Sequence, residues 1–182
     1  MLNLYLLMID STDDKNKLEL IYNQYKNLML NRAYDILKDR GLAEDAVHNA
    51  FIRILKNLDK ISEINCPKTK SFVVVIVENV SKTMYNKKNK IISVEFENTI
   101  SSGEQVEITV EKKNEVEIIK KKLASLPYIY KSVLIMKVYN GLSDKEISKV
   151  LNISVSAVQK RIYRARQTLL LSIKDGDDND KK

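Results

Sequence analysis

The sequence predicts an all-α protein made of two small helical domains joined by a flexible linker. Apolar residues recur at a spacing of three or four over most of the chain, and only 4 Gly and 2 Pro interrupt its 182 residues. The composition changes between 91 and 111, where five Glu and no Lys or Arg surround a Ser-Ser-Gly sequence. We therefore expect one domain at 11–90, an acidic linker at 91–113 and a second domain at 114–174.

Two amphipathic helices are expected at the start of the first domain. Residues 18–40 carry apolar side chains at helical spacing, and Gly41 follows them as the expected C-terminal cap. Residues 42–58 repeat the pattern, with Glu44 and Asp45 in the first turn, where carboxylates interact favourably with the helix dipole.

The stretch 72–80 reads FVVVIVENV and requires a choice between strand and helix. Its β-branched residues favour a strand by propensity. However, both the odd- and the even-numbered positions are apolar, so the alternation of a strand would not separate an apolar face from a polar one. At 100° per residue the side chains do separate. One side gathers Val73, Ile76, Val77, Val80 and Met84, and the other gathers Glu78, Asn79, Lys82, Tyr85 and Asn86, with Phe72 and Val75 near the border. We predict a helix with Ser71 as its N-cap, and a buried parallel strand is the alternative.

A helix-turn-helix is predicted in the second domain, within GLSDKEISKVLNISVSAVQKRIYRARQTLL. Ser143 and Glu146 have the spacing of a capping box that begins a short helix ending at Leu151. Asn152 and Ile153 follow as a tight turn, and Ser154 caps a second, basic helix.

The second helix of this motif has one apolar and one polar side. The apolar stripe comprises Val155, Val158, Ile162, Ala165 and Leu169. Ser156, Gln159 and Lys160 lie near the start of the helix, where side chains reach base edges. Phosphate contacts are expected further along and on the flanks, from Arg161, Arg164 and Arg166, and Tyr163 is expected to bind DNA on the same polar side. A basic, solvated helical hairpin without DNA is the alternative.

The remaining composition excludes several classes of protein. Cys66 is the single cysteine and His48 the single histidine, so neither a disulfide nor a cysteine- or histidine-based metal site is expected. No Gly-rich phosphate loop or acid cluster is present, and we expect no cofactor and no enzymatic activity. The apolar start MLNLYLLMID lacks a basic segment and is short, so we expect neither a signal peptide nor a membrane span, and a cytoplasmic location. A net charge of +7 is consistent with a polyanionic partner.

Both halves together resemble a known family. AEDAVHNAFIRIL and KSFVVVIVENVSKTMYNKKNK are similar to region 2 of sigma-70-type initiation factors, and LPYIYKSVLIMKVYNGLSDKEISKVLNISVSAVQKRIYRARQTL resembles their region 4. The short chain, with only a linker between the halves, resembles the extracytoplasmic-function subgroup. The resemblance implies a helical region 2 bundle that binds the β′ clamp of core RNA polymerase and the −10 element. It also implies a region 4 helix-turn-helix that binds the −35 element near the β flap, and an anti-sigma protein as regulator.

The resemblance also implies roles for individual residues. Contact with polymerase would involve Asp45, His48, Asn49, Phe51 and Ile52. The opened −10 strand would meet Phe72, Val75, Asn79, Lys82, Asn86, Lys87, Lys88 and Lys90. The chain departs from the family pattern at several of these positions. Phe72 replaces the usual Trp, Val75 and Glu78 replace arginines, and His48-Asn49 replaces a Gln-acid pair. A helix-turn-helix regulator that binds operator DNA without polymerase is the alternative function.

Overall fold

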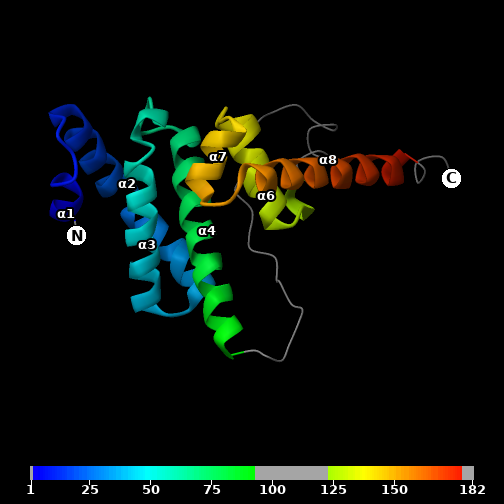
Figure 1. Ribbon diagram of the computed structural model, residues 1–182, viewed down its shortest axis with the longest axis horizontal. Helices are drawn as coiled ribbons and strands as arrows, with labels where there is room; N and C mark the ends of the chain where they lie inside the picture. Colours follow the sequence, from blue (N-terminus) through cyan, green and yellow to red (C-terminus); the bar gives the residue numbers. More distant parts are fainter. Residues whose placement is uncertain (1, 93–122, 178–182) are drawn as a thin grey trace. The chain divides into compact units, whose positions relative to one another are not determined.

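The computed structural model describes residues 2–92 and 123–177. Contacts between Cα atoms divide the chain into two compact units, Met1–Asn98 and Thr99–Lys182. All regular elements in the described residues are helical, which confirms the all-α prediction (Figure 1). The predicted linker lies outside the described residues from 93 onward, so its boundaries stay predictions.

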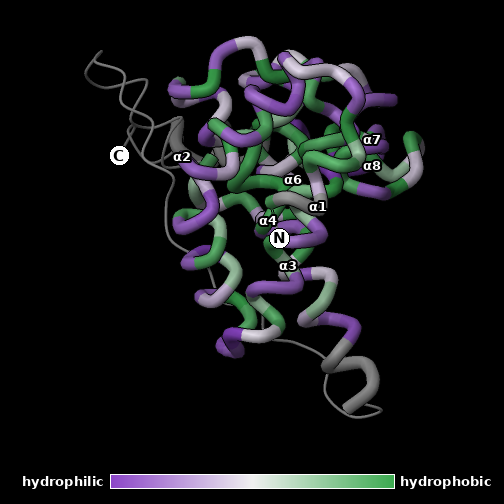
Figure 2. Tube along the Cα trace, turned by 90° about the vertical axis from the view of Figure 1, so that its left-hand side faces the viewer, coloured by the Kyte–Doolittle hydropathy of each residue, from purple (hydrophilic) through white to green (hydrophobic). Residues whose placement is uncertain are grey.

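The first unit is a bundle of three long helices preceded by a short one. Its elements are α1 (Leu2–Leu6), α2 (Thr12–Leu37), α3 (Arg40–Leu55), the 3-10 helix η1 (Leu58–Lys60) and α4 (Pro67–Ile92). Helices α2, α3 and α4 each pack on the other two, and α3 and α4 run side by side in opposite directions (Figure 1). Polar and apolar residues alternate along these helices (Figure 2), because each buries one side and exposes the other. The core includes Leu18, Ile21, Met29, Ala46, Phe51, Ile54, Val73, Ile76 and Val77.

The junction between α2 and α3 differs from the prediction. Lys38, and not Gly41, ends α2 in the left-handed conformation, with φ of 53°. Asp39 then caps α3 by accepting a hydrogen bond from the Leu42 N–H at 3.0 Å. Gly41 therefore lies inside α3, and Glu44 and Asp45 lie beyond its first turn. The prediction failed because the side chain of Asp39 caps α3, which then begins at Arg40, one residue before the glycine.

Helix α4 begins earlier than predicted. Ser71 lies within the helix rather than at its N-cap, because the helix already begins at Pro67, a residue suited to the first helical position. The sulfur of Cys66 accepts from the Thr69 N–H at 3.4 Å, and Thr69 Oγ1 donates to the Glu63 carbonyl at 2.5 Å. The helical prediction for 72–80 is confirmed and the strand alternative is wrong.

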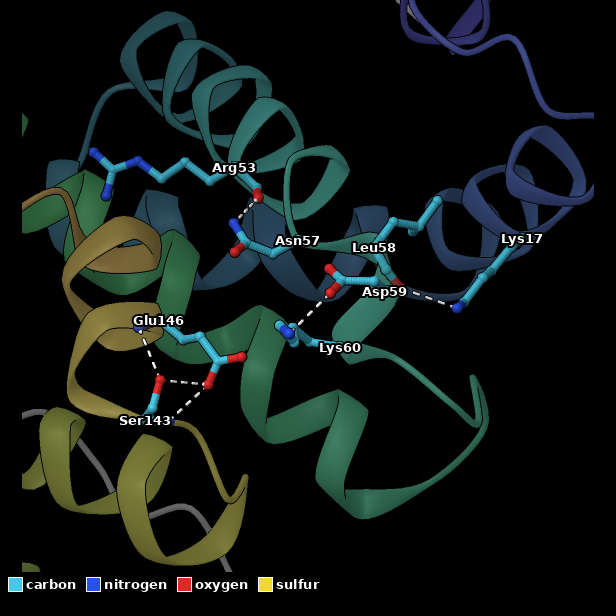
Figure 3. A network of polar contacts seen from close by, with 8 residues as sticks. All are labelled: Lys17, Arg53, Asn57, Leu58, Asp59, Lys60, Ser143 and Glu146. Carbon is cyan, nitrogen blue, oxygen red and sulfur yellow. Dashed lines mark hydrogen bonds and ion pairs between the residues drawn. The ribbon is translucent and has the colours of Figure 1, made fainter.

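Side chains of α2 hold the connection between α3 and α4 in place. Lys17 Nζ donates to the Leu58 carbonyl at 2.9 Å (Figure 3), and the Tyr25 hydroxyl donates to the Ile64 carbonyl at 2.6 Å. Burial raises the pKa of Tyr25, so this hydroxyl remains a donor at neutral pH. These bonds fix the start of α4 relative to α2.

The second unit contains a helix-turn-helix and the helix that precedes it. Its elements are α6 (Tyr128–Leu134), the π-helical turn η2 (Ile135–Tyr139), α7 (Asp144–Leu151) and α8 (Val155–Asp177). Helix α8 packs on both α6 and α7. Its core is formed by Val133, Met136, Ile147, Val150, Val158, Ile162 and Ala165. Among the described residues of both units, no helix has the length and apolarity needed to span a membrane.

Candidate nucleic-acid interface

Side-chain caps begin both helices of the helix-turn-helix. Ser143 Oγ accepts from the Glu146 N–H at 3.3 Å, and the Glu146 carboxylate accepts from the Ser143 N–H at 2.7 Å (Figure 3). Asn152 ends α7 in the left-handed conformation, with φ of 54°. Ser154 Oγ then accepts from the Ala157 N–H at 3.1 Å, which starts α8. The predicted capping box, turn and second cap are confirmed, and together they fix where the exposed side of α8 lies.

The predicted DNA-binding residues of α8 gather on its exposed side. Six of the seven are exposed, namely Ser156, Gln159, Lys160, Tyr163, Arg164 and Arg166, while Arg161 is half-buried. Val158, Ile162 and Ala165 are buried on the opposite side, and Val155 and Leu169 of the predicted stripe are half-buried. This side of α8 therefore presents hydroxyl, amide and cationic groups together, which suits contacts to bases and phosphates.

A polar cluster that the sequence did not predict lies beside this surface. Lys137 Nζ contacts the Asp144 carboxylate at 2.8 Å, and the Gln159 side chain lines the same cavity as these two residues. The hydrogen bond from Lys137, together with the positive charge of that lysine, lowers the pKa of Asp144, and the carboxylate is ionised at neutral pH. The three residues line an open cavity of about 320 Å³ together with Ile162, Tyr163 and Arg166.

The predicted strand-binding residues of α4 divide into a buried and an exposed group. Phe72 and Val75 are each 3% exposed, and all of 71–77 is buried, so both border residues fall on the buried side. Asn79 and Lys82 are half-buried, and Asn86 and Lys87 are exposed. Lys88 lies in α4, and its side chain is outside the described residues. The polar surface of α4 therefore begins near Glu78. A base could stack on Phe72 only after a rearrangement that exposes the ring of this residue.

The side chain of Asn79 is engaged by its own helix. Its Nδ2 donates to the Val75 carbonyl at 2.7 Å. Ser81 and Thr83 make the same bond, to the carbonyls of Val77 and Asn79, each at 2.8 Å. Polar side chains in this part of α4 thus bond the preceding turn.

The predicted polymerase contacts on α3 also divide by burial. Asp45 and Asn49 are exposed, and His48 and Ile52 are half-buried. Phe51 is 0% exposed, because its ring packs 5.0 Å from Tyr22 and 5.8 Å from Tyr5 between centroids. Its side chain therefore lies in the core beneath the predicted surface and not on it.

Helix α1 adds a contact to this surface that the sequence did not predict. The Tyr5 hydroxyl lies 2.7 Å from His48 Nδ1, and the two rings stack at 5.4 Å between centroids. Burial raises the pKa of Tyr5 to about 12, so the phenol stays protonated in neutral solution. Tyr5 is 1% exposed. The apolar composition of the first segment was the only feature of the sequence that could have indicated this packing.

The fold and its surfaces define a class of protein, namely a DNA-binding protein with a helix-turn-helix in one unit and a separate helical bundle in the other. No group of acidic, histidine or cysteine side chains within the described residues has the arrangement of a metal site. Family models for sigma-70 region 2 and sigma-70 region 4 match residues 21–91 and 117–169. The chain belongs to the sigma-70 family, in the extracytoplasmic-function group of RNA polymerase sigma factors.

Several relatives are similar over nearly the whole chain. The extracytoplasmic-function RNA polymerase sigma factor SigW of Bacillus subtilis (strain 168) is 28% identical over 85% of this chain and 88% of its own length. SigM of the same organism is 26% identical over 82% of this chain and 90% of its own. Among solved structures, the sigma factor RpoE from Bartonella quintana, in complex with the anti-sigma factor NepR, is 17% identical with a TM-score of 0.42, covering 90% of this chain and 98% of its own.

Proposed function

We propose that this sigma factor binds core RNA polymerase through the outer side of α3 and promoter DNA through α4 and α8. The observation that carries the proposal is the surface of α8, where six predicted DNA-binding side chains are exposed together on a helix whose start is capped by Ser154. A buried stripe on the opposite side of α8 leaves this surface available to enter a major groove.

The −35 element is the proposed target of α8. Ser156, Gln159 and Lys160 lie in its first two turns and would meet base edges. Arg161, Arg164 and Arg166 lie further along and would neutralise phosphates, so binding should weaken as salt rises. The β flap of polymerase is the proposed neighbour of this unit, by family membership.

The opened strand of the −10 element is the proposed target of α4. Lys82, Asn86 and Lys87 supply the polar and cationic groups that a single strand requires. Phe72 and Val75 are buried, so they would contact the strand only if their side chains became exposed in the complex with polymerase and DNA.

The outer side of α3 is the proposed contact with the polymerase β′ clamp. Asp45 and Asn49 are exposed there, with His48 and Ile52 partly so. Polymerase and promoter would place the protein in the cytoplasm, an anti-sigma protein would be its regulator, and the chain would have no catalysis of its own.

Runoff transcription tests this function directly. Core polymerase, the full chain and the DNA upstream of its own gene should yield a transcript of defined length, and core alone should yield none. A double variant, Asp45→Ala with Asn49→Ala, should lose transcription while its melting temperature stays near that of the unaltered chain. Promoter binding of equal strength with and without core polymerase would favour an operator-binding regulator and contradict the proposal.

A further inference from the structure

We propose that Tyr5 is a positioning residue that holds the His48 ring with its Nε2–H directed outward, so that α3 presents a hydrogen-bond donor to the polymerase clamp. Tyr5 comes from α1 and His48 from α3, and their side chains meet through a hydrogen bond of 2.7 Å and a ring contact. The inference rests on the proposed function, because it requires His48 to lie in the contact between α3 and polymerase.

The ring of Tyr5 is fixed within the core of the bundle. Its centroid lies 6.4 Å from that of Tyr22 on α2 and 5.8 Å from that of Phe51 on α3, and the residue is 1% exposed. An aromatic ring packed on two helices has little room for another rotamer. The Tyr5 hydroxyl therefore has a set place beneath α3, and it restrains the ring of His48, to which it is bonded.

The buried hydroxyl determines which nitrogen of His48 carries the proton. Burial raises the pKa of Tyr5 to about 12, so its oxygen keeps its proton in neutral solution. Within the described residues, His48 Nδ1 is the hydrogen-bond partner of this hydroxyl. A proton on Nδ1 would leave the buried O–H without an acceptor, which is costly. Tyr5 therefore donates to Nδ1, and the neutral imidazole carries its proton on Nε2.

The second nitrogen of His48 remains available to a partner. The residue is half-buried, and its Nε2 makes no hydrogen bond to any residue in 2–92 or 123–177. No imidazole nitrogen is among the buried polar atoms of these residues that lack a partner, so solvent reaches Nε2. Asp45 is exposed one turn earlier on α3, and Asn49 is exposed next to His48. An outward N–H among these residues suits a carbonyl or carboxylate oxygen of the partner.

Nitrogen NMR of the free chain tests the position of the proton. His48 is the single histidine, so a full chain labelled at histidine and free of any histidine tag gives one set of ring signals. At about pH 8, where imidazole is ordinarily neutral, long-range correlations to the ring hydrogens should show a protonated Nε2 and an unprotonated Nδ1. Tyr5→Phe keeps the ring but removes the donor, and it should move the two nitrogen shifts toward each other. Tyr22→Phe removes the other hydroxyl of the same aromatic group and, as the matched control, should leave both shifts unchanged.

Affinity for core polymerase tests what the outward donor does. Tyr5→Phe should raise the Kd by about 2- to 10-fold, the range that one hydrogen bond provides. His48→Gln should bind nearly as tightly as the unaltered chain, because the glutamine amide nitrogen is as many bonds from Cα as Nε2. His48→Asn should bind about 2- to 10-fold more weakly, because its amide nitrogen corresponds to Nδ1. Adding Tyr5→Phe to His48→Asn should cost nothing more, since Tyr5 acts through His48.

The outcomes distinguish failure of this inference from failure of the proposed function. A proton on Nδ1 in the unaltered chain, or a spectrum that Tyr5→Phe does not change, would overturn the positioning role. Equal affinity of His48→Gln and His48→Asn would overturn the role of the outward donor, as would an equal loss of affinity in Tyr22→Phe. Failure of the unaltered chain to bind core polymerase would refute the proposed function itself and leave the NMR result standing.

Discussion

The two units present their candidate DNA-binding residues in different ways. On α8, six of the seven predicted residues are exposed and lie opposite a buried stripe. On α4, the first two of the predicted residues, Phe72 and Val75, are buried at 3% exposure, and the polar surface begins after them. The difference shows that a capped amphipathic helix reveals its exposed side from its sequence, whereas a segment such as 72–77, which is apolar on every side, does not.

The largest effect should come from Phe51, which was predicted as a contact but lies in the core. Phe51→Ala should lower the free energy of unfolding by about 3–5 kcal/mol, because it leaves a cavity among Tyr5, Tyr22 and the bundle. Thermal and denaturant unfolding of the full chain would measure this. Asn49→Ala, at an exposed position on the same helix, is the matched control and should change stability by about 0.5 kcal/mol or less. A Phe51→Ala variant of normal stability that no longer bound polymerase would restore its place in the contact surface.

The next effect concerns Lys160 on the exposed side of α8. Lys160→Ala should weaken −35 binding selectively, costing about 1–3 kcal/mol of discrimination at one base position. Arg164→Ala is the matched control, and it should weaken all sequences alike while reducing the salt slope by about 1. Footprinting and titration at several salt concentrations would measure both. An unchanged −35 footprint for Lys160→Ala would show that the base-reading side of α8 is misplaced.

A smaller effect is expected from the cap of α7. Ser143→Ala removes the acceptor of the Glu146 N–H and should destabilise the helix-turn-helix by about 1 kcal/mol. Hydrogen exchange of the α7 amides would locate the loss. Lys145→Ala, exposed in the same turn, should leave their protection unchanged. Equal protection in the serine variant would mean that the capping box contributes little to holding α7.

The smallest effect should come from Lys87 and Lys88 of α4. Lys87→Ala combined with Lys88→Ala should impair promoter opening more than duplex binding, since these cations are proposed to meet the opened strand. The salt slope for strand capture should fall by about 0.7 for each phosphate that the variant no longer neutralises. Permanganate reactivity of the opened bases and filter binding of the duplex would separate the two steps. Equal losses in both assays would place these lysines on duplex DNA instead.

Most of the fold could be predicted from the sequence, because periodicity and caps are local properties. Ser143, Glu146 and Ser154 predicted the starts of α7 and α8, and helical spacing outweighed the strand propensity of 72–80. The start of α3 was missed because both Asp39 and Gly41 could mark a boundary, and only the backbone conformation at Lys38 decides between them.

The candidate site was less predictable because it depends on contacts between elements. No spacing rule places Asp144 and Gln159 in the lining of one cavity, since this depends on the angle between α7 and α8. The burial of Phe51 and its contact with Tyr5 likewise require the packing of three helices. The resemblance to the family places Phe51 in the interface, although Phe51 is also one of the apolar residues at helical spacing in 42–58.

Core-dependent footprinting of the promoter tests the central claim most directly. Full chain and core polymerase together should protect both the −35 and −10 elements and make bases near −10 reactive to permanganate. The chain alone should give neither signal at the same concentration. Protection of the same DNA by the chain without core, with no opened bases when core is added, would contradict the account.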